Sequence, residues 1–390
     1  MKTTYRIMLL AVALFIQSAA HAQWDSCALR ISLLTCSPGT ELYSTFGHTA
    51  IRVTDTVNGR DVVFNYGTFD DSDPYFYLKF TRGIMVYALS AESFDDFMQE
   101  YISEKRSVVQ QVLALSCTEK GKLLAALQDN LKEEHRFYNY HFYADNCTTR
   151  ARDIIRRHTS RPVVFNNILP SPAPSYRQII HTYLDQGGQD WSRFGIDLLL
   201  GSHLDERVTT EEAMFLPDML LKGLDSARQG TDPLVAYSSV VLAPARADGA
   251  AKNPLTPLLV FSLLALIIVV VSVVSIGKHM EKPLLIFDRV FFALVGLLGL
   301  LILFVWLGRV DSVCRNNLNL AWALPTHLFA VFFLGRRPGW LKGYWLFSAI
   351  VCGILLACWA WLPQGLNPAF MPLLIIILVR SIFISTKTRH

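Results

Sequence analysis

The chain has 390 residues, of which 52% are hydrophobic, and its mean hydropathy is +0.32. This composition excludes an ordinary soluble protein of this length. The formal net charge of +4 is modest, and most of the basic excess falls in short loops beside apolar segments. The charge therefore indicates a membrane protein and no nucleic-acid partner.

The N-terminus has the parts of a secretory signal peptide. Lys2 and Arg6 supply the initial charge, a short apolar run follows, and Ala20-His21-Ala22 is an A-x-A cleavage site. The apolar run is too short to cross a bilayer comfortably, although an uncleaved anchor is the alternative. We therefore predict a signal peptide over residues 1–22 and an exported domain that begins at Gln23.

The exported domain, residues 23–237, is predicted to be α+β, because alternating runs and helical runs are mixed along it. Strands are expected over 28–35, 47–55, 62–69, 107–115 and 136–143, with a two-residue hairpin turn at Asn58-Gly59. Helices are expected over 93–105, over 118–134 with Thr118 as the cap, over 148–158, and over most of the chain to residue 236. Residues 238–253 contain Ala, Pro and Gly and are expected to be a linker.

Five apolar stretches follow, and each approaches the ~20 residues that a helix needs to cross a bilayer. Packing them as buried soluble helices would leave too little polar surface to cover them. We therefore predict a five-helix transmembrane region over residues 254–384 and a cytoplasmic tail over residues 385–390. The stretches cover residues 255–276, 290–307, 318–334, 344–362 and 369–384.

The loop charges predict the orientation of these helices. The loops after the first, third and fifth stretches are basic, whereas the fourth loop, residues 363–368, is uncharged. By the positive-inside rule the basic loops are cytoplasmic, so the N-terminal domain lies in the periplasm. This orientation agrees with export, and it predicts a multi-pass inner-membrane protein. The basic residues are Lys278 and Lys282, then Arg336, Arg337 and Lys342, then Arg380, Lys387 and Arg389.

Three polar residues of the membrane region admit two interpretations. His327 lies inside the third stretch, where an ionisable side chain is either functional or hydrogen-bonded to a neighbouring helix. Arg309 and Arg315 lie in an outward loop, where they are either ordinary loop charges or contacts for lipid phosphates.

Seven cysteines are divided between the two regions. The membrane region holds Cys314, Cys352 and Cys358, and the exported domain holds four more. A free Cys147 leaves three exported cysteines, which allow at most one disulfide in the oxidising periplasm. Cys27–Cys36 would close the shortest loop, but the sequence does not choose among Cys27, Cys36 and Cys117. The chain has no C-x-x-C spacing, so we expect no metal and no cofactor.

Cys147 is the candidate nucleophile because a predicted strand ends at a polar corner just before it and a helix begins there. The positive end of the helix dipole, together with Arg150, favours the thiolate. The alternative is a buried or disulfide-bonded cysteine. Asn146 can be the helix N-cap, and Arg150 and Asp153 can form a surface pair.

His48 is the best placed of the exported histidines to serve as the base for a thiol. It begins a predicted strand, on the face opposite to Thr49, Ile51 and Val53. Gly47 leaves room for a partner to approach. His141 is nearer to Cys147 along the chain, but catalytic groups usually meet across a fold.

Three motifs resemble a known family of exported bacterial domains. They are Leu42-Tyr43-Ser44-Thr45-Phe46-Gly47-His48-Thr49-Ala50-Ile51-Arg52-Val53, then Phe64-Asn65-Tyr66-Gly67-Thr68-Phe69, then Asp145-Asn146-Cys147-Thr148-Thr149-Arg150. Residues 194–201 and 215–218 add further matches. With membrane helices behind it, the domain resembles the Lnb-type lipoprotein N-acyltransferases of Bacteroides-like bacteria. That family is similar to circularly permuted NlpC/P60 and papain-like thiol enzymes.

The resemblance implies Cys147 as nucleophile and His48 as its base, with Asn146, Thr148, Arg150 and Asp153 in support. Asn65 is only a tentative orienter of His48. A two-residue turn at Asn58-Gly59 would leave Asn65 about four positions away from His48, roughly 13 Å. A hydrogen bond between them then requires a bulge or a longer loop.

The resemblance also implies the reaction, in which an acyl chain passes through a Cys147 thioester to the N-terminal amine of a diacylated lipoprotein. A membrane phospholipid is the expected acyl donor, and the lipoprotein itself is the alternative. One alternative is a membrane-anchored cysteine peptidase or amidase that acts on peptidoglycan. Five apolar stretches favour a lipid substrate, because one span would anchor a wall hydrolase. The other alternative is a binding module without activity, in which Cys147 forms a disulfide.

Overall fold

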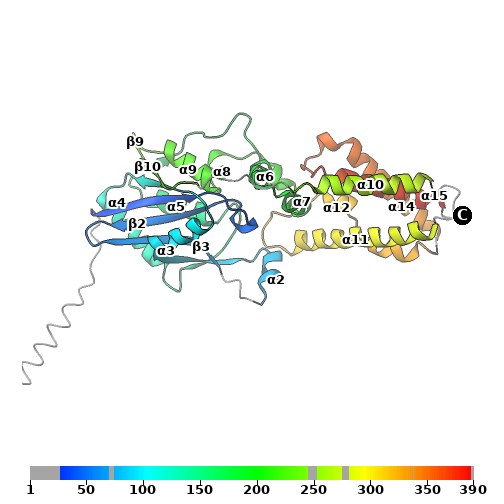
Figure 1. Cartoon of the computed structure of the whole chain (residues 1–390), viewed down its shortest axis with the longest axis horizontal. Coiled ribbons are helices and arrows are strands. Elements are labelled where there is room, and N and C mark those ends of the chain that lie inside the picture. Colours follow the sequence, from blue (N-terminus) through cyan, green and yellow to red (C-terminus); the bar gives the residue numbers. More distant parts are fainter. Residues whose placement is uncertain (1–26, 70–73, 245–252, 275–280, 337, 388–390) are drawn as a thin grey trace, which may run out of the picture.

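The computed structural model describes residues 27–69, 74–244, 253–274, 281–336 and 338–387, so the predicted signal peptide lies outside the described residues. A mixed α/β domain forms one end of the elongated molecule, and the apolar helices α10, α11, α14 and α15 form the other (Figure 1). Helices α6 and α7 lie between the two ends (Figure 1).

The exported domain is built on a seven-stranded antiparallel sheet. In spatial order its strands are β10 (Val235–Leu242), β5 (Val108–Leu113), β1 (Leu29–Cys36), β2 (His48–Asp55), β3 (Arg60–Phe69), β4 (Val86–Ser93) and β6 (Phe137–Asn139). A second sheet is formed by β7 (Val163–Val164), β8 (Arg228–Gln229) and β9 (Asp232–Pro233).

Helices cover both faces of the seven-stranded sheet, because its central strands alternate apolar side chains between two cores. Ile51 and Val53 pack on one face, against α4 (Cys117–Asn130), α5 (Cys147–Arg157) and α9 (Pro217–Ser226). Ala50 and Val63 pack on the other face, against α3 (Phe94–Ser103). The other helices of the domain are α2 (Phe76–Thr81), α6 (Tyr176–Gln186), α7 (Asp190–Leu199) and α8 (Thr210–Ala213), with 3-10 turns η1 (Leu42–Ser44) and η2 (Ser202–Asp205).

The hairpin between β2 and β3 differs from the expected two-residue turn. The last paired residues are Asp55 and Arg60, so four residues form the loop. The Asp55 carboxylate accepts the amides of Val57 and Asn58 at 3.0 Å, which stabilises this longer turn. The pairing of β2 with β3 is therefore shifted by two residues from the predicted register.

Other elements also differ from the predicted ones. Helix α4 begins at Cys117 with Ser116, not Thr118, as its N-cap, because the side chains of Ser116 and Glu119 form a capping box. The expected strand over 136–143 is paired only over Phe137–Asn139, and β4 and α2 were not predicted at all. Strand β10 runs to Leu242 and pairs with β5, so the sheet extends into the expected linker.

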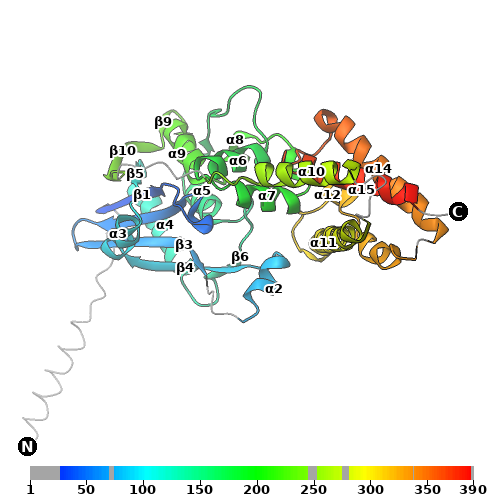
Figure 2. The same cartoon turned by 45° about the vertical axis from the view of Figure 1, so that its right-hand side comes forward.

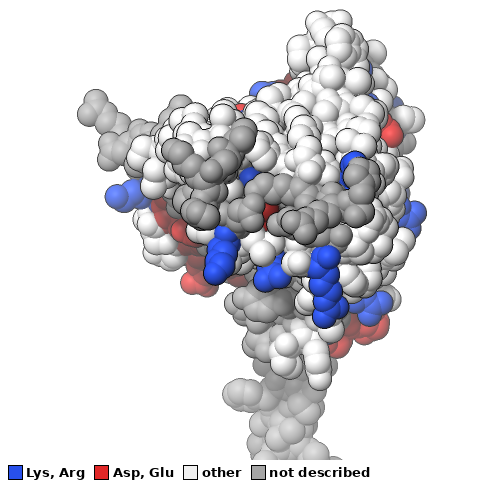
Figure 3. Space-filling view, turned by 90° about the vertical axis from the view of Figure 1, so that its right-hand side faces the viewer, with Lys and Arg blue, Asp and Glu red and all other residues white. Residues whose placement is uncertain are grey.

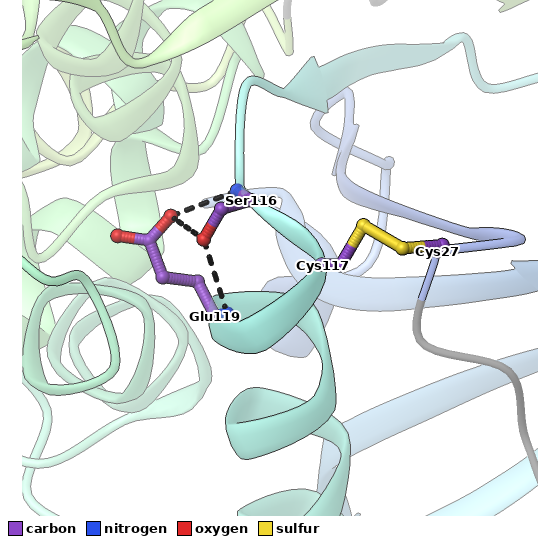
Figure 4. The surroundings of a disulfide bond; sticks show 4 residues. All are labelled: Cys27, Ser116, Cys117 and Glu119. Atoms are coloured by element: carbon purple, nitrogen blue, oxygen red, sulfur yellow. Dashed lines mark hydrogen bonds between the residues drawn. A yellow bond between two sulfur atoms is a disulfide. The ribbon is translucent and has the colours of Figure 1, made fainter.

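The disulfide joins Cys27 and Cys117, while Cys36 is free and buried. It ties the start of the described chain to the first turn of α4, next to the capping box of Ser116 and Glu119 (Figure 4). A bridge of this span constrains the unfolded chain more than the shorter Cys27–Cys36 loop would.

Among the described residues, three helices of the apolar region are long enough to cross a membrane. They are Pro257–Val274 (α10), Lys282–Gly308 within α11, and Gly339–Ala357 (α14). The third and fifth predicted stretches form shorter apolar helices, Asn319–Phe333 and Phe370–Thr386. The third is broken near Pro325, which separates α12 (Asn319–Trp322) from α13 (His327–Ala330) and η3 (Val331–Phe333). The remaining elements are α11 (Glu281–Gly308), η4 (Trp359–Trp361) and α15 (Phe370–Lys387).

Arg380 is not the loop charge that the sequence suggested. It lies buried within α15 and makes a two-pronged ion pair with Asp288 of α11, at 2.7 Å for both bonds, and it donates to Ser272. Such pairing is what a charged side chain needs inside an apolar helix bundle. Lys282, Arg336 and Lys342 are exposed at the end of the molecule that faces away from the exported domain. Figure 3 shows this end, where several basic side chains stand on a largely uncharged surface.

His327 is fully buried and lies 2.8 Å from the Tyr344 hydroxyl through Nδ1. Its ring stacks on Trp345 with a centroid distance of 5.3 Å. Both partners belong to α14. The hydrogen bond to a neighbouring helix is therefore the interpretation that the structure supports.

Candidate active site

Cys147 is the first residue of α5, and Asn146 fixes this helix start. The Asn146 side-chain oxygen accepts the amides of Thr148 and Thr149 at 2.9 Å, and its amide nitrogen donates to the carbonyls of Phe142 and Phe215. Asn146 is therefore the N-cap, and its buried side chain holds the corner rigidly in front of the thiol.

His48 and Asn65 meet because of the longer β2–β3 loop. In the observed register Asn65 lies opposite Ala50, two positions from His48, instead of four. Asn65 Oδ1 lies 2.8 Å from His48 Nε2 and also accepts the amide of Gly67 at 2.8 Å. Because a backbone amide only donates, this atom of Asn65 is the oxygen, and His48 Nε2 carries the hydrogen. The Nδ1 atom of a neutral His48 is then free to accept the thiol proton.

Gly67 makes room for the His48 ring. A β-carbon at this position would lie 2.6 Å from His48 Cε1, which is too close for any side chain. Any larger residue here would therefore push the imidazole away from its position. Gly47, which we expected to leave room for a partner, instead has a positive φ of 78°, and a β-carbon there would clash with the Cys36 carbonyl.

The titration of Cys147 and the titration of His48 are linked. Burial alone would raise the pKa of the Cys147 thiol, but the charge and hydrogen bonding of His48, with help from the Thr49 amide and Thr148, lower the pKa to about 7. Burial would likewise lower the pKa of His48, but the Cys147 thiolate and the Asn65 hydrogen bond raise it overall. Near neutral pH the arrangement therefore favours a thiolate beside an imidazolium.

Thr148 supports the thiol from the next position on α5. Its hydroxyl lies 3.7 Å from Cys147 Sγ and 3.1 Å from the Thr49 hydroxyl on β2. The contact joins the helix to the strand that carries His48. Thr148 is fully buried, so this link is protected from solvent.

Arg150 and Asp153 do not form the expected pair. The Arg150 guanidinium makes two hydrogen bonds to Asp145, at 2.6 and 2.8 Å, and lies 3.7 Å from the Tyr138 ring centroid. Asp153 instead pairs with Arg152 at 2.8 Å and with Arg156 at 3.8 Å. The reason is that the corner before α5 brings Asp145 back against the helix, so Arg150 braces the corner.

The other sulfur and imidazole groups have different surroundings. Burial raises the pKa of the Cys36 thiol to about 12, so that thiol stays protonated. His141 belongs to the corner itself, where its backbone forms an antiparallel β-bridge with the backbone of Asp145. Within the described residues, no group of three or more His, Cys, Asp or Glu side chains is arranged to hold a metal ion.

Sequence reasoning missed a buried polar junction around Asp197 of α7. This fully buried carboxylate accepts from Arg177 and His181 of α6, at 2.9 and 2.8 Å, and from Asn367 of the membrane region at 2.9 Å. Asn319, also in the membrane region, donates to the Asp197 carbonyl. The signal in the sequence is an aspartate within the apolar helical run of residues 194–201.

Gly201, just after α7, completes this junction. Its amide donates to the Val313 carbonyl at 2.9 Å, and a β-carbon would lie 1.6 Å from the Arg315 carbonyl oxygen. The junction therefore requires glycine here. It fixes the exported domain on the outer ends of the membrane helices.

Two family models match this chain. The Lnb N-terminal periplasmic domain matches residues 17–182, and the Lnb transmembrane domain matches residues 249–390. No curated protein and no solved structure matches it. The two models include His48, Asn65 and Cys147 in the first segment and all the apolar helices in the second. The chain therefore belongs to the Lnb family, as a membrane protein with a periplasmic N-terminal domain.

Proposed function

We propose that this protein is a lipoprotein N-acyltransferase that uses Cys147 as its nucleophile and His48 as its base. The observation that carries the proposal is the chain of contacts from Asn65 through His48 to Cys147, at the start of a capped helix. Membership of the Lnb family supports a role in lipoprotein processing. The proposed substrates are a membrane phospholipid, as acyl donor, and a diacylated lipoprotein, as acceptor.

In the first step the Cys147 thiolate attacks the ester carbonyl of the phospholipid. A carbon–sulfur bond forms, the ester carbon–oxygen bond breaks, and the leaving alkoxide takes the proton that His48 received from the thiol. The products are a thioester on Cys147 and a lysolipid. The Thr148 and Thr149 amides are occupied by Asn146, so the Cys147 amide is the first-turn donor left for the oxyanion.

In the second step the free N-terminal amine of the lipoprotein attacks the thioester. His48 accepts a proton from the amine, the carbon–sulfur bond breaks, and Cys147 leaves as a thiolate beside the imidazolium. The product is an amide. Since both substrates are lipids confined to one surface, attachment of the domain to the membrane raises their effective concentration.

Two finer structural features belong to the same proposal. A helix that begins with cysteine and packs on a strand that presents histidine agrees with a permuted papain-like fold. Five membrane crossings are proposed because the ends of successive apolar helices alternate. The end of α11 and the loop before α15 both contact the exported domain, while the exposed Arg336, between η3 and α14, lies at the opposite end. This alternation supports the proposal of a cytoplasmic C-terminus.

The test uses purified full-length protein with phospholipid vesicles and a synthetic diacylated lipopeptide, analysed by mass spectrometry. Wild type should gain one acyl group on Cys147 and transfer it to the lipopeptide amine. Cys147→Ala should do neither, whereas Cys358→Ala, at an exposed free cysteine of the membrane region, should behave as wild type.

A wild-type protein that leaves the lipopeptide mass unchanged would contradict the proposal. Release of peptidoglycan fragments that depends on Cys147 would instead assign the hydrolase alternative. The alternative of an inactive module with a disulfide at Cys147 loses its premise, because the disulfide joins Cys27 and Cys117 and Cys147 is free.

A further inference from the structure

A largely apolar cavity of about 370 Å³ lies in the exported domain between the end of β3, the start of β4, β6 and α2. This is the lower part of the volume range of small-molecule pockets. Neither β4 nor α2 was expected from the sequence, and the mechanism above does not use them. The apolar walls are formed by Phe69, Ile84, Met85, Val86, Tyr87 and Phe137.

One wall of this cavity lies near Cys147. The Tyr87 ring, which lines the cavity, stacks on Tyr140 with a centroid distance of 4.4 Å. Tyr87, Tyr140 and Cys147 all pack against the same hydrophobic core. Burial and the Cys147 thiolate raise the pKa of Tyr87 to about 12, which agrees with this proximity. The Tyr87 side chain therefore lines the cavity and also lies near the nucleophile.

The other side of the cavity is fixed to the membrane region. The chain between α2 and β4 lies against the outer end of α11, where the Val310 amide donates to the Arg82 carbonyl at 3.0 Å. Arg309 also donates to the Thr81 carbonyl, at 3.4 Å. Figure 2 shows α2 next to β6, on the side of the domain that faces α11.

The rim of the cavity has the properties of a hydrocarbon site at a membrane surface. Phe69, Val86 and Phe137 are 40%, 48% and 49% exposed. The rim of the cavity is therefore an exposed apolar surface, which a bound hydrocarbon chain would shield from water. Lys79 and Arg136 add two cationic side chains to the lining. Their methylene stems can extend the apolar wall, and their charged ends can pair with lipid phosphates.

From these contacts we infer that this cavity is the acyl-chain site of the enzyme. It takes the hydrocarbon chain of a phospholipid whose ester carbonyl lies at Cys147 Sγ, and it retains that chain while the thioester exists. The inference rests on the proposed acyltransferase function. It assigns chain binding to the exported domain, while the membrane helices position that domain.

The test fills the cavity and measures which chain lengths react. Val86→Trp puts a large ring at an exposed site on the rim, and Val240→Trp, at a 62% exposed site on β10, is the matched control. Each full-length protein is mixed with phosphatidylethanolamine that carries palmitoyl or hexanoyl chains. The rate of thioester formation is measured by intact-protein mass spectrometry.

Val86→Trp should slow acylation by the palmitoyl lipid at least about tenfold, as exclusion of two methylenes would. Acylation by the hexanoyl lipid should change less than about twofold, because the short chain needs little of the cavity. Val240→Trp should match wild type with both lipids. If Val86→Trp does not fold, as judged by loss of its cooperative thermal unfolding, Phe137→Trp replaces it at another exposed rim position.

An unchanged chain preference in folded Val86→Trp and Phe137→Trp would overturn the acyl-chain site while leaving the proposed function intact. A wild-type protein that forms no thioester with either lipid would contradict the function itself. The two failures are therefore distinguishable in one set of spectra.

Discussion

Two clusters of ionisable groups in this protein use similar chemistry for different ends. At the junction, Asp197 is fully buried and has polar partners on every side, from Arg177, His181 and Asn367. At the candidate active site, Asn65 accepts from one nitrogen of His48, and the residue Cys147 is only partly buried. A cluster whose polar groups all have hydrogen-bond partners stabilises the fold, whereas a cluster with an accessible nucleophile can react.

The two clusters also differ in how the charge of their central group, Asp197 or Cys147, is stabilised. Burial alone would raise the pKa of Asp197, but His181, Arg177 and Asn367 outweigh it and lower the pKa. This carboxylate is therefore kept charged by fixed partners. The Cys147 thiolate depends on one movable proton, which it shares with His48. Four substitutions test this contrast.

The largest effect is expected for His48→Ala. Without the imidazole, Cys147 has no base, so thioester formation should fall by about 10²–10⁴-fold. The measurement is intact-protein mass spectrometry with phospholipid vesicles, at pH 7 and as a time course. His135→Ala, at an exposed histidine that pairs with Asp129, should keep the wild-type rate. A His48→Ala protein that acylates at the wild-type rate would remove His48 from the mechanism.

Asp197→Ala should lower the free energy of unfolding more than it lowers the rate of thioester formation. It leaves Arg177 and His181 without their shared carboxylate, and the loss of one partner of a buried pair costs about 3–5 kcal/mol. Thermal unfolding of the detergent-solubilised protein measures the loss. The control is Asp185→Ala, which removes a half-exposed carboxylate of α6 that pairs with Arg193 of α7. This variant should lose about 1 kcal/mol of stability or less. Equal losses in the two variants would show that the junction is not a structural cluster.

The pH dependence of Cys147 alkylation tests the shared proton. In wild type the iodoacetamide rate should rise with a midpoint near pH 7, since the pKa of Cys147 is lowered to about 7 from an ordinary value of 9.0. The Cys147 contribution to stability is complete above pH 9.0 and is lost as the pH falls through about 7.

Asn65→Ala should move this alkylation midpoint upward, because the Asn65 hydrogen bond helps to keep His48 charged. Asn65→Asp keeps an acceptor at the same atom and adds a negative charge that favours the imidazolium, so the midpoint should not rise as it does in Asn65→Ala. An unshifted midpoint in Asn65→Ala would mean that Asn65 does not position the base.

The smallest effect is expected for Arg150→Gln. Since Arg150 pairs with Asp145 and lies on Tyr138, its removal should weaken the corner by about 1 kcal/mol or less. The alkylation midpoint should stay near pH 7. The measurements are thermal unfolding and the same alkylation profile, and Asp145→Asn should give a similar loss of stability. A midpoint that rises by a unit would restore the direct effect of Arg150 on the thiolate that the sequence suggested.

Local signals predicted some of this molecule well. The N-cap at Asn146, the helix behind Cys147 and the strand that carries His48 each depend on a few consecutive residues, so they could be read from the chain. The α2 helix and β4 could not, because their short apolar runs have no clear period. The third apolar stretch was recognised by hydropathy, but its break near Pro325 makes it shorter than a spanning helix.

The order of the regions, the apolar character of the second region and the chemical candidates Cys147 and His48 follow from local composition or spacing, so they are predictable from the chain alone. Which side chains meet depends instead on the packing of distant segments. A loop two residues longer than expected brought Asn65 to His48, and the chain's path chose Cys117 as the partner of Cys27 and Asp145 as the partner of Arg150. Such partners depend on strand register and helix packing, and a shift of two residues in one ladder moves every contact on that face.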